Sequence, residues 1–140
     1  MTDTELVAKK LALIETYVRE LRDLANPAAV VDDVRERRFV EHTLQIAIQA
    51  TLDIASHVVS EERLGEPETN GQLFDRLAAA QWISSGQRKV LVAMVGFRNV
   101  LVHGYATVDP AIVRNVVEHH LGDLTDFVAA IRSRLANPPI

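Results

Sequence analysis

The feature that most restricts the fold of this chain is a series of long apolar stripes with helical spacing. In the first stripe, apolar side chains recur every three or four residues, at Val7, Leu11, Ile14, Val18, Leu21 and Ala25. This spacing places them on one side of an α-helix. Similar stripes run through residues 40–58, 90–101 and 113–135, and no segment alternates convincingly as a strand does. The sequence therefore predicts an all-α protein.

Capping signals divide these stripes into separate helices. Thr2-Asp3-Thr4-Glu5 has the form of a capping box, and Asn26-Pro27 is a sequence at which a helix ends. Asp32 or Asp33 can cap a longer second helix, and Asp109-Pro110 begins the last one. The expected helices span residues 2–26, 33–62, 72–81, 87–102 and 110–137. They predict a single-domain bundle of about five helices over residues 1–140, with its core at about 3–136.

Composition narrows the range of partners. The chain has no cysteine, which excludes disulfides, thiolate metal sites and a cysteine nucleophile. Its net charge is −4, from 15 basic and 19 acidic residues, which argues against a general nucleic-acid binder and leaves open a nuclease that grips RNA locally. An acidic N-terminal segment without a long apolar run predicts neither a secretion signal nor a membrane span, and hence a cytoplasmic protein.

The residues with the most chemistry lie at the expected end of the fourth helix. RNA can be cut without a metal if a base deprotonates the 2′-hydroxyl, a cation stabilises the phosphorane and an acid protonates the leaving oxygen. His103 suits the proton transfers and Arg98 suits the phosphate, because its planar guanidinium is always charged. Asn99 can orient a hydroxyl or the imidazole, and Tyr105 can donate to a phosphate oxygen. These four residues are the candidate site.

The spacing of the arginine and the histidine sets a geometric condition. Five residues along a regular helix separate Arg98 and His103 by about 140°, so they converge only if the helix ends or distorts between them. We expect a left-handed cap at Gly104, with His103 at the helix exit. A symmetric dimer would supply the second histidine that combined acid and base catalysis needs. The pattern alone favours a structural alternative, a helix end at which His103 bonds a free carbonyl and Tyr105 packs.

Other polar residues are weaker candidates. Arg38 belongs to a basic cluster in the first turns of the second helix, where cations oppose the helix dipole, so the cluster either faces solvent or binds an anion. His42, one turn later, can line a cleft, whereas His57 is expected to make a buried or interface hydrogen bond. His119 and His120 point about 100° apart on a helix, so they are not expected to bind one metal ion together. We expect neither a metal site nor a cofactor.

Residues 98–105 match the Arg-polar-x3-His-x-Tyr signature of the HEPN superfamily, and the chain resembles the HepT-type toxins within it. The resemblance extends to Phe97, to Phe39-Val40-Glu41-His42, to residues 50–58 and to Gly65-Glu66-Pro67. It covers roughly residues 1–136.

The resemblance implies a HEPN-like helical homodimer that acts as a metal-independent endoribonuclease. The Arg98–His103 pairs of the two subunits would meet in a cleft at the dimer interface. It also implies a toxin inhibited by a minimal nucleotidyltransferase antitoxin, which in part of the family transfers AMP to the motif tyrosine, here Tyr105. An adenylyl phosphate there would place negative charge beside Arg98. Two alternatives stay open: a non-catalytic module that binds a nucleotide or docks the nucleotidyltransferase, and a purely structural dimer.

Overall fold

The computed structural model describes residues 2–104 and 108–138, and within them the chain forms α-helices, one short 3₁₀ helix and connecting loops, without a strand. The helices are α1 (Thr4–Leu24), η1 (Pro27–Ala29), α2 (Val34–Glu61), α3 (Asn70–Ala79), α4 (Ser85–His103), α5 (Pro110–His119) and α6 (Leu121–Ala136). The expectation of an all-α bundle is confirmed.

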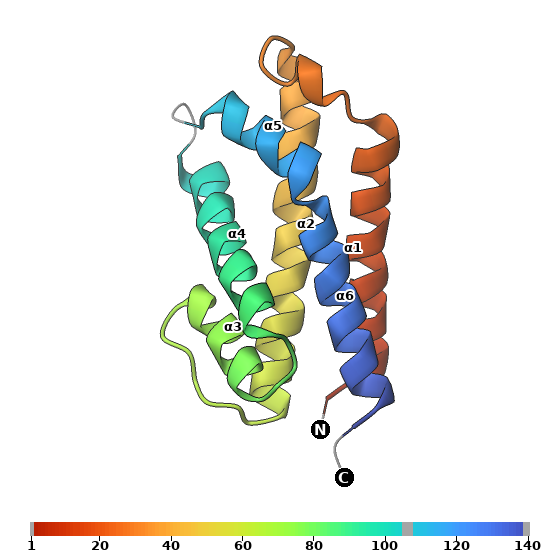
Figure 1. Ribbon diagram of the computed structural model, residues 1–140, viewed down its shortest axis with the longest axis vertical. Helices are drawn as coiled ribbons and strands as arrows, with labels where there is room; N and C mark the ends of the chain where they lie inside the picture. The colour runs from red at the N-terminus through yellow and green to blue at the C-terminus, as the bar shows by residue number, and fades with distance from the viewer. Residues whose placement is uncertain (1, 105–107, 139–140) are drawn as a thin grey trace.

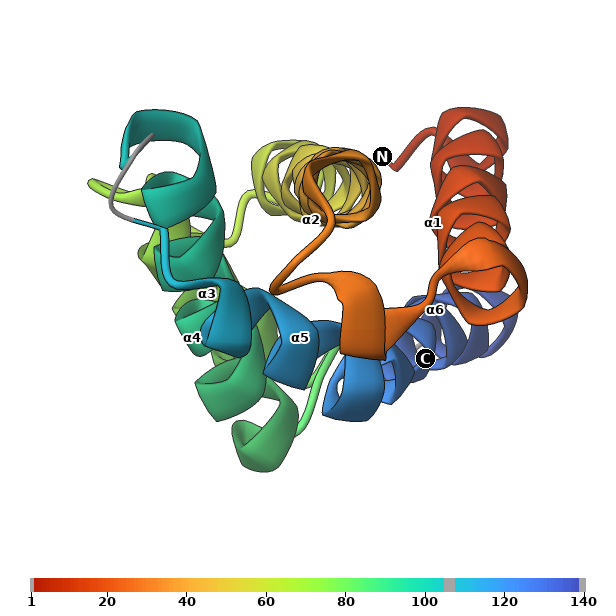
Figure 2. The same cartoon turned by 90° about the horizontal axis from the view of Figure 1, so that it is seen from above.

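The bundle is arranged around α2, which contacts α1, α3, α4, α5 and α6. α1 and α6 lie side by side along one flank, α3 and α4 lie along the other, and α5 crosses near one end (Figure 1). Seen from above, α1 and α4 stand on opposite sides of α2 (Figure 2). α2 and α4 run in opposite directions, so the end of α4 lies beside the first half of α2 (Figure 1).

The core is built from the apolar stripes that the sequence contains. Val7, Leu11, Ile14, Val18 and Leu21 of α1 are all buried. The largest buried side chains include Phe74 and Phe127, whose rings meet edge to face with centroids 6.2 Å apart. Burial of this apolar surface is the main term that stabilises the bundle.

Three helix starts show how well capping signals predict boundaries. Asp33 caps α2, where its Oδ1 accepts from the backbone N–H of Arg35 and Glu36. Ser84 and Gln87 form a capping box at the start of α4. The predicted cap at Thr2 is wrong: Asp3 caps α1, because the hydroxyl of Thr2 is engaged elsewhere and donates to Glu62.

The expected last helix is broken into α5 and α6 at His120. His120 has φ −120° and ψ 4°, which is not a helical conformation, and its Nδ1 lies 2.8 Å from Asp123 Oδ2. The apolar stripe continues across the break, since Val117, Leu121 and Leu124 are all buried. Because the stripe is continuous, the spacing of apolar residues does not indicate the helix boundary at His120. The residues that follow, Leu121 and Gly122, do not indicate it either.

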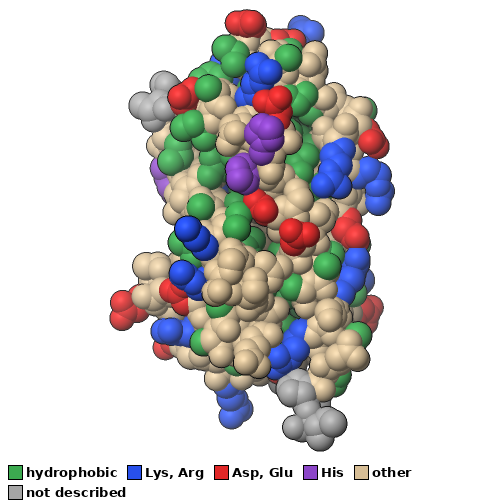
Figure 3. All heavy atoms as spheres, viewed as in Figure 1, with side chains coloured by type: hydrophobic (Ala, Val, Ile, Leu, Met, Phe, Trp, Pro, Cys, Tyr) green, Lys and Arg blue, Asp and Glu red, His purple; other side chains and the backbone are tan. Residues whose placement is uncertain are grey.

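The surface carries charges of both signs. On the face shown in Figure 3, Lys and Arg side chains are interspersed with Asp and Glu and do not form a continuous basic band. This distribution accords with the acidic net charge of −4. Among residues 2–104 and 108–138, no helix has both the length and the apolar character that crossing a bilayer requires.

Candidate active site

Arg98, Asn99 and His103 lie on the last turns of α4, which stays helical up to its final residue, His103. The backbone N–H of Gly104 donates to the carbonyl of Val100 at 2.7 Å, and Gly104 has φ −82° and ψ −18°. The expected left-handed cap at Gly104 is therefore wrong, because the helical turn continues through it. His103 does lie at the helix exit, as expected. A regular helix keeps Arg98 and His103 about 140° apart and about 7.5 Å apart along its axis.

Arg98 is half-buried where α4 packs on α2. Its Nη2 donates to Gln49 Oε1 at 2.7 Å, and its Nη1 donates to Asn99 Oδ1 at 3.2 Å. Its Nε is buried and finds no acceptor among the residues that the structure describes. A guanidinium has five N–H donors, two of them on each terminal nitrogen. Within residues 2–104 and 108–138, each terminal nitrogen of Arg98 therefore keeps a second N–H, which suits a phosphate with two oxygens to bind.

The other motif residues are placed differently from Arg98. His103 is exposed, and so is Asn99, whose amide oxygen is bonded to Arg98. Asn99 therefore contacts the guanidinium in this structure, and its predicted role in orienting a hydroxyl or the imidazole stays a prediction. Tyr105 lies outside the described residues. One chain therefore presents an oriented arginine and a solvent-facing histidine on the same helix end, without bringing the two side chains together.

The candidate cleft residues Arg38 and His42 lie in the first half of α2. His42 is exposed and precedes Gln49 by seven residues, which puts it on the same side of α2, about two turns nearer the helix start. Arg38 is also exposed and lies one turn closer to the start of α2 than His42, with its Nη1 3.8 Å from Glu41 Oε1. Their role as cleft-lining residues stays a prediction. His57 accepts a hydrogen bond from the backbone N–H of Asp3 at 3.1 Å, as a structural histidine should.

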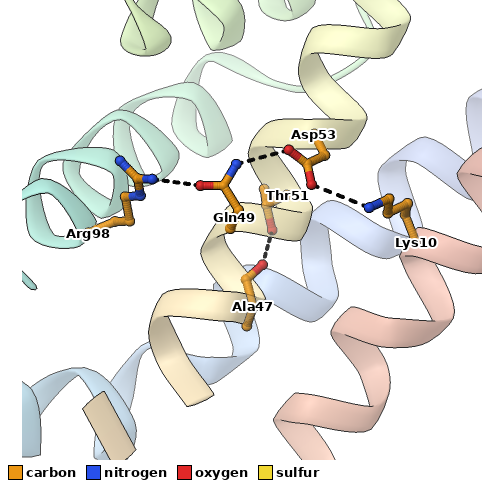
Figure 4. Close-up of polar contacts among 6 residues, drawn as sticks. All are labelled: Lys10, Ala47, Gln49, Thr51, Asp53 and Arg98. Carbon is orange, nitrogen blue, oxygen red and sulfur yellow. Dashed lines mark hydrogen bonds and ion pairs between the residues drawn. The ribbon is translucent and has the colours of Figure 1, made fainter. Parts of the chain in front are cut away.

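Three polar residues that are linked to Arg98 by hydrogen bonds do not stand out in the sequence. They are Gln49 and Asp53 of α2 and Lys10 of α1, which continue the hydrogen bonds of Arg98 across three helices (Figure 4). The available signal is a pair of polar residues one turn apart on a helix whose neighbouring positions are apolar. That spacing predicts a shared side of α2 but not which helix faces it.

No cluster of three or more His, Asp or Glu side chains suited to a metal ion occurs in the described part of the chain. The groups that the arrangement does offer are an amide, an imidazole and a cation, some of whose N–H donors have no acceptor among residues 2–104 and 108–138. These are the components of acid–base chemistry at a phosphate.

A helical bundle with an arginine held at the end of one helix, five residues before an exposed histidine, has the architecture of the HEPN class of proteins. The model of the family "Ribonuclease HepT-like" matches residues 14–131. The chain belongs to the HepT-like ribonuclease family.

Individual relatives agree with this membership. The mRNA nuclease HepT of Shewanella oneidensis is 29% identical over 130 residues, which cover 92% of this chain and 98% of the relative. The tRNA nuclease HepT of Aphanizomenon flos-aquae is 29% identical over 139 residues, covering 96% and 95%. Among solved structures, a tri-AMPylated Shewanella oneidensis HEPN toxin in complex with an MNT antitoxin superposes with a TM-score of 0.85 at 30% identity, covering 95% of this chain and 99% of the toxin.

Proposed function

We propose that this protein is the toxin of a toxin–antitoxin pair and cleaves RNA without a metal ion. The observation that carries the proposal is the Arg98 guanidinium, which a neutral amide holds at the α2–α4 junction and which keeps N–H donors that no residue in the described part of the chain occupies. The relatives support an RNA substrate, since one is an mRNA nuclease and another a tRNA nuclease. We place its action in the cytoplasm, where such substrates occur.

The chemistry follows from the groups at the end of α4. His103 removes the proton of a 2′-hydroxyl, whose oxygen attacks the adjacent phosphorus and displaces the 5′-oxygen. Arg98 stabilises the additional negative charge on the phosphorane oxygens, which is larger in the transition state than in the bound RNA. The leaving 5′-oxygen takes a proton from a second acid. Asn99 keeps the guanidinium oriented through its hydrogen bond at 3.2 Å.

A second copy of the chain supplies the second histidine that acid and base catalysis together require. Arg98 and His103 diverge on a regular helix, and one exposed imidazole cannot be base and acid at the same time. In a homodimer with two α4 ends side by side, His103 of each subunit can serve the cleft that contains Arg98 of the other. Arg38 and His42 would extend the walls of this cleft along α2 and bind RNA beyond the scissile phosphate.

The proposed partner is a minimal nucleotidyltransferase antitoxin, as in the complex of the Shewanella toxin with its MNT antitoxin. That toxin is tri-AMPylated. In this chain we take Tyr105, the tyrosine of the motif, as the acceptor of AMP. An adenylyl phosphate on Tyr105 would occupy the donors of Arg98 and exclude RNA. Co-expression with the nucleotidyltransferase should raise the intact mass by one or more AMP units, and Tyr105→Phe should remove at least one of them. An unchanged mass would contradict inhibition by AMP transfer.

The direct test of the enzyme is cleavage of cellular RNA by the purified protein in excess EDTA. We expect Arg98→Ala and His103→Ala each to reduce the rate on the order of a hundredfold or more, because each removes a group that acts in the transition state. Arg88→Ala is the matched control on the same helix, since Arg88 is half-buried and paired with Asp75. His119→Ala is the control for the histidine, because His119 is also exposed and also the last residue of a helix.

The outcome of this assay distinguishes an enzyme from a non-catalytic binding module. Cleavage that resists EDTA and depends on Arg98 and His103 supports the proposal. Tight nucleotide binding without any cleavage would favour a non-catalytic module that binds a nucleotide or docks the nucleotidyltransferase. Equal cleavage by the wild type and both site variants would point to a contaminating nuclease and overturn the assignment.

A further inference from the structure

A chain of hydrogen bonds connects Arg98 to the far side of the bundle. Arg98 Nη2 donates to Gln49 Oε1 at 2.7 Å, Gln49 Nε2 donates to Asp53 Oδ1 at 2.9 Å, and Lys10 Nζ lies 3.4 Å from Asp53 Oδ2. Figure 4 shows the four side chains in a row from α4 across α2 to α1. Gln49 and Asp53 are both half-buried, so their contacts are not those of freely moving surface groups.

The two charged groups in this row determine which atoms donate hydrogen bonds and which accept them. A carboxylate only accepts hydrogen bonds and an ammonium only donates them. Asp53 therefore requires the NH₂ group of Gln49, and this leaves the amide oxygen of Gln49 for the guanidinium. The orientation of an amide is otherwise ambiguous, because its two ends have the same shape. Asp53 thus determines which end of Gln49 faces Arg98.

The row also separates two opposite charges. The acceptor that touches Arg98 is a neutral amide, while the negative charge lies one residue further on, where Lys10 pairs with it. A carboxylate in direct contact would orient Arg98 as well, but it would neutralise the guanidinium and compete with a phosphate. A glutamine backed by an aspartate orients the arginine and leaves its charge for the substrate.

We propose that Gln49 and Asp53 are positioning residues, which hold the Arg98 guanidinium in its working orientation while leaving its charge unpaired. This inference deepens the proposed function and rests on it. It assigns no contact with RNA to either residue. Their effect is transmitted through Arg98 alone.

Gln49→Glu separates positioning from a merely structural role. The substitution keeps the size of the side chain and adds a charge that attracts Arg98, but it also replaces the N–H donor to Asp53 with a second carboxylate. Thermal unfolding therefore accompanies the assay, and activity is compared at a temperature well below the Tm of both proteins. We expect kcat/KM for RNA cleavage to fall by about tenfold or more, because the new carboxylate occupies the donors that bind the phosphate. A glutamine with a merely structural role would lower the Tm on this change without lowering kcat/KM of the folded protein.

Asp53 is tested by a pair of substitutions with opposite expectations. Asp53→Asn keeps the shape but can donate to Gln49 and reverse its amide, so kcat should fall by about tenfold. Asp53→Glu changes the length but keeps an acceptor-only group, and it should retain most of the activity. Asp75→Asn is the matched control, since the Asp75 side chain is 41% exposed against 40% for Asp53 and is likewise paired with a cation.

Binding of 2′-O-methyl RNA, which lacks the attacking hydroxyl, keeps this test independent of cleavage. Gln49→Glu and Arg98→Ala should each weaken binding by about tenfold and reduce the slope of log Kd against log salt concentration by about one phosphate contact. If the wild type cleaves RNA and Arg98→Ala does not, wild-type behaviour of Gln49→Glu and Asp53→Asn would overturn the positioning role alone. If the wild type does not cleave RNA, the proposed function fails, and the binding data still decide the inference. Binding unaffected by Gln49→Glu would then overturn it.

Discussion

Val100 provides the sharpest test of the proposed dimer. It lies between Arg98 and His103 on the last turn of α4, and it is 45% exposed although it is a large apolar residue. Replacing an exposed side chain costs an isolated subunit about 0.5 kcal/mol, and a carboxylate in the last turn of a helix adds about 0.3–1 kcal/mol through the helix dipole, which is small beside the stability of a folded domain. A dimer that joins the two α4 ends would instead cover this residue in both copies. Val100→Asp should therefore leave the folded subunit intact and weaken the dimer.

The size of the effect follows from the exposed fraction. Full burial of a valine contributes about 1.5–3 kcal/mol, so covering the exposed 45% of Val100 contributes roughly 0.7–1.4 kcal/mol per subunit. A two-fold interface counts this contribution twice, which gives about 1.4–2.8 kcal/mol. The loss of this term alone raises the dimer Kd by about 10–100-fold. Desolvation of the two new carboxylates destabilises the dimer further, so we expect Val100→Asp to raise the dimer Kd at least a hundredfold.

Sedimentation equilibrium measures the dimer Kd, and RNA cleavage is followed at protein concentrations on either side of it. We expect the cleavage rate of Val100→Asp to fall in proportion to the dimer fraction and to recover at high concentration. Leu24→Asp is the control, because Leu24 is 66% exposed at the end of α1, on the opposite side of the bundle from α4 (Figure 2). A dimer broken by Leu24→Asp and untouched by Val100→Asp would refute the placement of the interface at α4.

Two further predictions concern the stability of the bundle. Phe127→Ala should lower the free energy of unfolding by about 3–5 kcal/mol, because Phe127 is 0% exposed and packs edge to face on Phe74. Thermal unfolding should show a Tm about 10 °C or more lower, and a shift under about 2 °C would contradict this packing. The hydrogen bond from Arg132 lowers the pKa of Glu15, so this pair between α1 and α6 stabilises the fold at neutral pH and stops doing so as the pH falls from about 4.5 through the lowered pKa. Urea unfolding of the wild type and Glu15→Gln should differ by less than about 1 kcal/mol at pH 7, since the pair is exposed, and should coincide near pH 2.

Local signals in the sequence were sufficient for most helix boundaries. Asp33 and Ser84 cap helices because their side chains lie within reach of the next turn in any fold. The prediction failed at Thr2, where a contact with Glu62, sixty residues away, decided which side chain caps α1. It also failed at His120, because a continuous apolar stripe does not report a change in helix direction.

By itself, the sequence determined the all-α class, the core-facing residues and the identity of the motif from Arg98 to Tyr105, because these depend on periodicity and residue type over short distances. The tertiary structure alone decided what Arg98 touches. Gln49 stands forty-nine residues from it and meets it only because α2 and α4 pack antiparallel. The structure also decided that α4 remains regular as far as His103, so that the two motif side chains diverge within one chain. Contacts between helices depend on how several apolar faces are buried together, and no single stretch of sequence contains that information.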